Sequence, residues 1–214
     1  MTIAEPSYLS VKAIWGTVIR IEVRDSIDEL ALDSLWTWFQ RVDDLFSTWR
    51  DDSEIVRIAR GALDIADASP EVPAVLALCE ALRRRSRGAF DIAFASAAAG
   101  PPRAGHCAID PTGLVKGWAV DRAGELLDAN GASNFAINAG GDVLVRGVPE
   151  PGASWRVGIQ HPWERDKTAE VVAVSDCAIA TSGDYERGDH VIDARTGQPA
   201  SAFASVTVIA SELA

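Results

Sequence analysis

The chain of 214 residues suits one large domain or two small ones, and its 48% hydrophobic and 24% charged residues are typical of a globular protein with a core of its own. A formal net charge of −11 argues against a nucleic-acid-binding groove, which requires clustered lysines and arginines. No apolar run approaches the roughly 20 residues of a membrane span, and no basic segment followed by an apolar one opens the chain, so we expect neither a span nor a signal peptide.

The first half of the chain is predicted to be mostly helical, after one strand. Ile14–Val23 alternates apolar and polar residues, which is typical of a half-buried strand. Apolar residues then recur at spacings of three and four, the period of an amphipathic helix. The predicted helices cover Ser26–Phe46, the segment from the capping residue Ser53 to Gly61, and Pro70–Arg87, which Gly88 ends.

The second half is predicted to be mostly strands, after a loop and one more helix. Phe90–Asp110 reads as an irregular loop, Pro111–Gly113 as a turn and Lys116–Ala129 as a helix. The predicted strands are Asn134–Asn138, Asp142–Gly147, Trp155–Gln160, Glu170–Ile179, His190–Asp193 and Ser205–Ile209. Helices first and strands afterwards indicate an α+β fold rather than a regular βαβ alternation.

The segment INAGGDVLVRG predicts a tight hairpin at Gly140 and Gly141, because paired glycines supply positive φ angles without steric strain. A hairpin by itself needs neither the asparagine before these glycines nor the acid after them. Asn138 and Asp142 are therefore candidate polar walls beside a bare backbone that a ligand can approach.

Lys116 and Gly117 lie at the predicted start of a helix, where free N–H groups favour an anion. A lysine there suits a phosphate, although this motif alone favours an ordinary surface lysine near a turn. In GAFD, Phe90 reads as a core residue, while Asp91 could cap a turn, bind a metal or accept a hydrogen bond from a ligand.

The polar stretch Ala180–Ala200 contains His190, with Asp189 and Asp193 available to orient it. Histidine titrates near neutral pH, so His190 could act as a general acid or base; a polar loop with one exposed histidine is the alternative. The chain has no G-x-S-x-G motif, no zinc-ligand spacing and no Walker or dinucleotide glycine motif.

The chain contains three cysteines, Cys79, Cys107 and Cys177, which are far apart and odd in number. We expect no disulfide framework and a reducing, cytoplasmic location.

Each motif is weak alone, but their order along almost the whole chain is specific. From about Ile14 to Ile209 the chain reads WGTVIRIEV, STWRDDSEIVRI, GAFD, GLVKGWAVDRA, NFAINAGGDVLVRG, WRVGIQHP, ATSGDYER, HVIDARTGQPA and SVTV. In this order it resembles the ApbE family of FAD:protein FMN transferases, in a short form. The resemblance implies one α+β domain over residues 1–214 of ApbE-like (T-fold-like) architecture, with helices mostly in the first half and an antiparallel β-rich second half.

The resemblance also implies an activity. Such proteins bind FAD and, with Mg²⁺, transfer its FMN half to a threonine or serine hydroxyl of an acceptor protein; some relatives instead hydrolyse FAD to FMN and AMP. The implied cofactor contacts are Trp15, Trp49, Ala89, Phe90, Asp91, Lys116, Asp142, Thr181, Ser182 and Gly183. The carbonyl of Ala119 would face the metal, His190 would be the catalytic histidine, and all of these residues would meet in one pocket.

Four departures from the family pattern bear on this site. Trp15 stands where a methionine is common and Trp49 where a tyrosine is frequent, and the segment Ile92–Val115 is shorter than its counterpart in longer relatives. Relatives also continue past SVTV into an aspartate and a threonine, about four residues apart, that bind the metal. We therefore expect that the sequence is clipped before this tail, or else that the metal site has been lost.

Three hypotheses about function follow. The first is an FMN transferase acting on a protein, the second is an FAD-binding protein without turnover, and the third is an FAD pyrophosphatase. The transferase requires an acceptor protein as partner, whereas no nucleic acid or membrane partner is expected, and the oligomeric state is open.

Overall fold

A computed structural model of the chain describes residues 5–94, 108–183, 191–200 and 202–214. These residues divide into two compact units. The sheet unit comprises the described residues of 1–38, 117–191 and 201–214, and the helical unit comprises those of 39–116 and 192–200. Helices α1 (Glu29–Phe46) and α5 (Thr112–Ala129) each run from one unit into the other.

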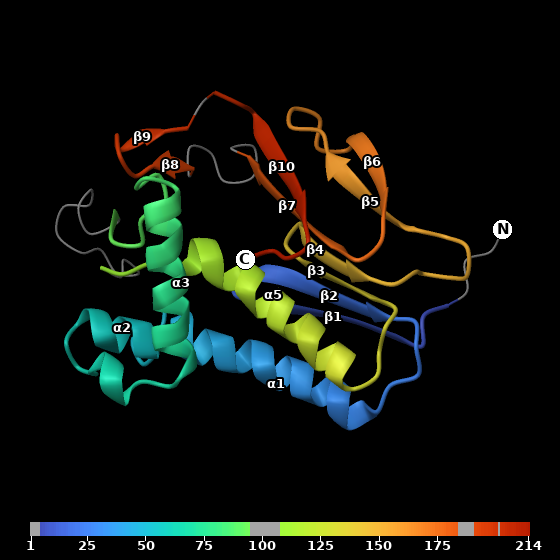
Figure 1. Cartoon of the computed structure of the whole chain (residues 1–214), viewed down its shortest axis with the longest axis horizontal. Helices are drawn as coiled ribbons and strands as arrows, with labels where there is room; N and C mark the ends of the chain where they lie inside the picture. Colours follow the sequence, from blue (N-terminus) through green and yellow to red (C-terminus); the bar gives the residue numbers. More distant parts are fainter. Residues whose placement is uncertain (1–4, 95–107, 184–190, 201) are drawn as a thin grey trace. The chain divides into compact units, whose positions relative to one another are not determined.

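The sheet unit is built on a six-stranded antiparallel sheet in the order β1-β2-β3-β4-β7-β10 (Figure 1). Its strands are β1 (Tyr8–Ile14), β2 (Thr17–Val23), β3 (Phe135–Ala139), β4 (Asp142–Arg146), β7 (Cys177–Gly183) and β10 (Ser205–Ala210). Fully buried residues such as Ile19, Ile137 and Leu144 line one face. Burial of these apolar side chains is the main contribution to the stability of this unit.

Helices cover that face. A Cβ atom added to Gly124 of α5 would stand 2.6 Å from a methyl carbon of Leu144, so the helix backbone packs directly on β4. The first part of α1 joins β1 through a hydrogen bond of 3.0 Å from the Trp36 indole to the Tyr8 hydroxyl. The opposite face carries the hairpin of β5 (Trp155–Gln160) and β6 (Thr168–Val174), whose Trp155 packs on β4 and β7.

Two segments that were each predicted as one strand are interrupted by a turn. Within Ile14–Val23, Trp15 and Gly16 adopt φ angles of 55° and 68° and form a two-residue turn between β1 and β2, with Ile14 paired to Thr17. The predicted strand Glu170–Ile179 is likewise the end of β6 and the start of β7, divided at Asp176 with φ 49°. In both cases the apolar pattern continues through the turn, so periodicity alone does not reveal it.

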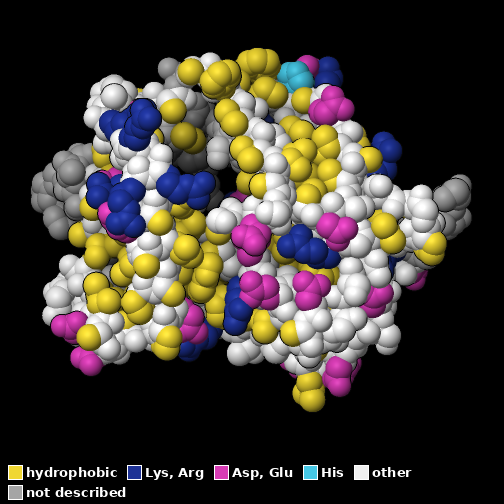
Figure 2. All heavy atoms as spheres, viewed as in Figure 1, with side chains coloured by type: hydrophobic (Ala, Val, Ile, Leu, Met, Phe, Trp, Pro, Cys, Tyr) yellow, Lys and Arg dark blue, Asp and Glu magenta, His cyan; other side chains and the backbone are white. Residues whose placement is uncertain are grey.

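The helical unit contains α2 (Glu54–Ala59), η1 (Ile65–Asp67), α3 (Glu71–Arg85) and the short pair β8 (Ile192–Asp193) and β9 (Gln198–Pro199), besides parts of α1 and α5. The predicted cap of α2 is confirmed, because the Ser53 hydroxyl accepts a hydrogen bond from the N–H of Val56. Helix α3 ends in three arginines, and Figure 2 shows basic side chains gathered over this end of the helix.

The α+β class, with helices mostly in the first half and antiparallel strands in the second, is confirmed. The two units are described separately, so the single domain over residues 1–214 stays a prediction. Among the described residues, no helix has both the length and the apolar character that crossing a membrane requires.

Candidate functional site

The glycine pair between β3 and β4 forms the predicted tight hairpin. Gly140 and Gly141 have φ angles of 58° and 95°, and Ala139 pairs with Asp142 across the turn. A Cβ atom on Gly140 would lie 2.2 Å from the Thr17 hydroxyl oxygen, whereas one on Gly141 would meet no atom within 4 Å. The turn is therefore packed against β2 at its first glycine and open at its second.

Asn138 has a structural task that the sequence interpretation did not assign. Its side-chain oxygen accepts a hydrogen bond of 3.0 Å from the N–H of Gly141, so the asparagine stabilises the hairpin turn itself. The inference that a hairpin needs no asparagine here is wrong, and Asn138 need not be a ligand wall. Asp142 begins β4 and is partly exposed beside the same turn.

Several predicted site residues meet at one end of the six-stranded sheet. The Trp15–Gly16 turn opens β2 at the end where the Gly140–Gly141 turn joins β3 to β4. The register of β4 on β7 brings Thr181 to that same end, because Val143 pairs with Ile179 and β7 then continues past the turn. The Thr181 hydroxyl lies 2.9 Å from the hydroxyl of Thr207 on β10. We call this region the turn end of the sheet.

The carbonyl of Ala119, the predicted metal contact, lies inside α5 and accepts a hydrogen bond of 2.9 Å from the Trp38 indole. The Trp38 and Trp118 rings also pack edge to face, with centroids 5.2 Å apart. Within the described part of the chain, no group of three histidines, cysteines or acids is placed to hold a metal ion. Proteins usually hold Mg²⁺ with only one or two side-chain oxygens together with substrate phosphates and water, so the Mg²⁺ site stays a prediction.

Lys116 does not lie at a helix start, contrary to the prediction. Helix α5 begins at Thr112, because the Asp110 carboxylate accepts hydrogen bonds from the N–H and the hydroxyl of Thr112 and so caps the helix. The free N–H groups of the first turn belong to residues before Lys116, which is the fifth helical residue. Any role of Lys116 towards an anion must come from its ammonium group alone.

Gly117 and Asp121, one turn apart on α5, hold the segment after β10, a role that sequence reasoning missed. The Asp121 carboxylate accepts hydrogen bonds from the N–H groups of Leu213 and Ala214, at 2.9 to 3.0 Å. A Cβ atom on Gly117 would come within 2.8 Å of the Leu213 carbonyl oxygen. Burial raises the pKa of Asp121, although these N–H groups oppose the shift. In the sequence, the signal for this role was the spacing of Gly117 and Asp121 in KGWAVD, which places both residues on one side of the helix.

The helical unit carries the other predicted contacts. Trp49, between α1 and α2, is 78% exposed. Asp91 accepts a hydrogen bond of 2.9 Å from the N–H of Ala93 and so caps a turn, one of the roles considered for it. Phe90 is half-buried and lies beside Gly113 of α5, and the Ala89 carbonyl accepts a hydrogen bond from Ala194.

His190 and Asp189 lie outside the described residues, so the role of His190 stays a prediction. Asp193, the other candidate partner, forms an ion pair with Arg195. The hydrogen bonds from the Arg195 side chain and backbone lower the pKa of Asp193 to about 2. Ser182 and Gly183 end β7 at the turn end, and the single pocket joining residues of both units also stays a prediction.

Comparison with known proteins places these features in a family. Two curated relatives named FAD:protein FMN transferase, from Vibrio cholerae and Escherichia coli K12, are 34% and 35% identical over 111 and 112 residues, covering 47% and 48% of this chain. The matched segment spans about a third of each relative, 33% and 32% of their lengths.

Solved structures share the fold. The flavin transferase ApbE of Vibrio cholerae superposes with a TM-score of 0.80 at 23% identity, covering 96% of this chain and 82% of that one. The apo form of the Pseudomonas stutzeri flavinyl transferase ApbE gives 0.81 at 20% identity, covering 100% and 83%. The model of the ApbE family matches residues 15–99 and 102–214. The chain therefore belongs to the ApbE family.

Proposed function

We propose that this chain is an FAD:protein FMN transferase, which transfers the FMN half of FAD to a threonine or serine hydroxyl of an acceptor protein. The observation that supports this most is membership of the ApbE family over nearly the whole chain, together with relatives that carry this activity in their names. The turn end of the sheet supplies a suitable surface, with hydroxyl groups and a glycine backbone side by side.

The proposed reaction moves one phosphoryl group. The acceptor hydroxyl oxygen bonds to the phosphorus of the FMN half, the bond from that phosphorus to the bridging oxygen of the diphosphate breaks, and AMP leaves. The hydroxyl proton passes to a base, for which we propose His190. Such a transfer depends mainly on positioning and on neutralisation of charge. We keep Mg²⁺ as a predicted requirement and ascribe no step to it.

Contacts with FAD are proposed for each group of residues. Gly141 leaves backbone open to a ligand, and the hydroxyl of Thr181 can donate a hydrogen bond at the same end of the sheet. Trp15 and Trp49 offer flat rings for stacking on a flavin or an adenine. Lys116 supplies a positive charge that suits a diphosphate.

The experiment follows AMP release from FAD in the presence of Mg²⁺ and a lysate of the native host as a source of acceptor. We expect AMP release by the wild-type chain and a loss of about 10²–10⁴-fold in the His190→Ala variant, the usual contribution of a general base. FAD binding, followed by quenching of flavin fluorescence, should be unchanged in the variant. Equal AMP release by the two proteins would exclude His190 as the base.

A second candidate is an FAD-binding protein without turnover. It is favoured by the Ala119 carbonyl, the predicted metal contact, which accepts a hydrogen bond from the Trp38 indole instead. This candidate predicts FAD binding with no AMP release under any condition. A pyrophosphatase would instead release equal amounts of AMP and free FMN without any lysate.

A further inference from the structure

The loop between α1 and α2 combines an exposed aromatic ring with a network of charged groups. Trp49 is 78% exposed, and the next residue, Arg50, contacts three carboxylates. All of these groups belong to the helical unit. We call residues 47–53 the Trp49 loop.

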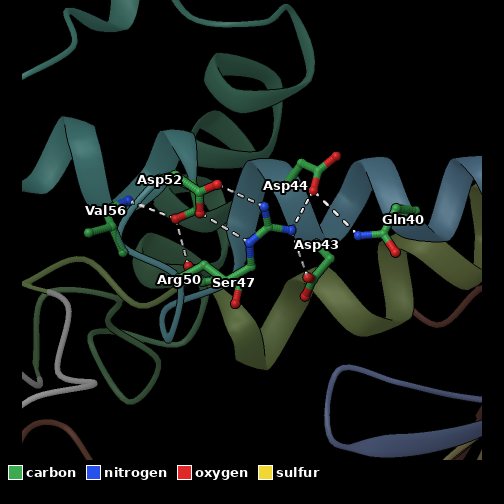
Figure 3. Close-up of polar contacts among 8 residues, drawn as sticks. Gln40, Asp43, Asp44, Ser47, Arg50, Asp52 and Val56 are labelled. Atoms are coloured by element: carbon green, nitrogen blue, oxygen red, sulfur yellow. Dashed lines mark hydrogen bonds and ion pairs between the residues drawn. The ribbon is translucent and has the colours of Figure 1, made fainter.

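Arg50 joins the Trp49 loop to the end of α1. Its Nη1 atom donates hydrogen bonds to Asp43, at 3.2 Å, and to Asp44 in the last turn of the helix. Its Nε and Nη2 atoms donate to the two oxygens of Asp52, at 3.1 and 3.0 Å. Figure 3 shows the guanidinium group between the helix and Asp52. Such a two-pronged pair fixes the orientation of the arginine as well as its position.

The positive charge of Arg50 stabilises the C-terminal end of α1. The last turn of the helix contains no basic residue and does contain acids, which oppose the partial negative charge of a helix C-terminus. Arg50 supplies the missing positive charge from outside the helix. The hydrogen bonds that Arg50 donates lower the pKa of Asp52. The same kind of bond to Asp52, Asp43 and Asp44, in that order of effect, raises the pKa of Arg50 itself.

Ser53 closes the other side of the Trp49 loop. It is fully buried, and its hydroxyl donates a hydrogen bond of 2.7 Å to the Ser47 carbonyl while accepting one from Val56. The N–H of Ser53 also donates to the Arg50 carbonyl. The backbone on both sides of Trp49 is therefore held, although the indole itself projects into solvent.

We propose that Arg50 is a positioning residue that holds the Trp49 indole ready to stack on a flat ring of FAD. This inference rests on the proposed function, because it takes FAD as the ligand. Arg50 is outnumbered by its three acidic partners, so the surroundings of the indole carry excess negative charge and disfavour the diphosphate. Trp49 thus receives a ring of the ligand, and a loop fixed before binding avoids the entropy loss of ordering it.

The test compares Arg50→Gln with a matched control, Arg60→Gln. Arg60 also pairs with an acid of the same loop, Asp51, at 2.7 Å, but it does not connect the loop to α1. Wild type and variants are labelled with 5-fluorotryptophan, and the Trp49 signal in the ¹⁹F NMR spectrum is identified by its absence in Trp49→Phe. Without ligand, we expect the Trp49 signal to narrow and to shift towards that of free 5-fluorotryptophan in Arg50→Gln only.

FAD binding is measured on the same proteins. We expect the dissociation constant to rise about tenfold in Arg50→Gln and to stay unchanged in Arg60→Gln, since only the first variant loses the preorganised loop. AMP and FMN are titrated separately, and the one whose binding weakens in Arg50→Gln identifies the ring that meets Trp49.

An unchanged Trp49 signal together with unchanged FAD binding in Arg50→Gln would overturn the proposal. Should Arg50→Gln fail to fold, Asp52→Asn takes its place, because it removes one acidic partner of Arg50. An unchanged Trp49 signal together with unchanged FAD binding in Asp52→Asn would likewise overturn the proposal. Failure of the wild type to bind FAD would reject the proposed function instead, and the ligand-free NMR comparison would still decide whether Arg50 orders the loop.

Discussion

At the scale of single residues, Trp49 is the side chain whose role is most open to measurement. The residue is 78% exposed, so replacing it with alanine removes little packing. We expect Trp49→Ala to weaken FAD binding by about 1–3 kcal/mol, the range found when an aromatic ring that stacks on a base is removed. Trp163→Ala is the control, since Trp163 is equally exposed but lies after β5. Equal effects of the two substitutions on the FAD dissociation constant would argue against stacking at Trp49.

Single residues also show where sequence reasoning ends. The resemblance named Trp49 as a contact, but nothing in the sequence shows that Arg50 pairs with Asp43 and Asp44, because a loop reversal brings them together. The same holds for Asp121, which binds the backbone of residues 213 and 214 more than 90 positions away. Residue type predicts what a side chain can do, whereas its partner depends on the fold.

At the scale of elements, the Gly140–Gly141 turn connects β3 to β4 and packs against β2. Both glycines have positive φ angles, but only Gly140 stands against Thr17. We expect Gly140→Ala to lower the free energy of unfolding by about 1–3 kcal/mol more than Gly141→Ala, because overpacking adds to the shared backbone strain. Urea denaturation of the two variants measures this difference.

Adding Thr17→Ala to Gly140→Ala removes the hydroxyl that the new Cβ would meet. Most of the difference between the two glycine variants should then disappear. If the double variant is no more stable than Gly140→Ala, contact with Thr17 is not the reason that this position requires glycine.

The elements themselves were largely predictable. The periodicity of α1 and α3, the Ser53 cap and the Gly140–Gly141 hairpin were all predicted and are confirmed. The errors lie at turns and helix starts that the apolar pattern does not mark. Asp110 starts α5 before Lys116, and the Trp15–Gly16 turn divides a run that reads as one strand.

At the scale of the whole molecule, Asp25 makes the stability of the folded state depend on pH. Its carboxylate accepts hydrogen bonds from the N–H groups of Ser133 and Asn134 and from the Asn134 side chain, and so joins the end of β2 to the start of β3. Burial raises the pKa of Asp25, but these hydrogen bonds together lower it below its ordinary value of 3.8. Asp25 is therefore charged in the folded state at neutral pH.

The pKa of Asp25 is lower in the folded state than its ordinary value of 3.8, so the ionised carboxylate stabilises the fold. This contribution to the free energy of unfolding is complete above pH 3.8 and is lost as the pH falls through the pKa of the folded state. We expect Asp25→Asn to lower the free energy of unfolding by about 1–2 kcal/mol at neutral pH, because hydrogen bonds to a charged group are lost. The difference from wild type should shrink below about pH 4 in urea titrations. A difference that is constant down to pH 3 would contradict the assignment.

The fold as a whole followed from the order of motifs, and the comparison with solved structures confirms it. The metal site stays a prediction, because the Ala119 carbonyl is described only as the acceptor of a hydrogen bond from the Trp38 indole. The order of the family motifs along the chain predicts the scaffold and the candidate ligand contacts. A metal ion needs several donor atoms close together, and the order of motifs does not show which atoms the fold brings together.

The central claim is that this chain attaches FMN to a protein. The most direct measurement incubates it with FAD, Mg²⁺ and a lysate of the native host, then examines the proteins on a denaturing gel for flavin fluorescence. We predict a fluorescent band that survives denaturation, requires both FAD and the chain, and appears together with AMP. Release of AMP and free FMN with no fluorescent band, or no change in FAD at all, would contradict the claim.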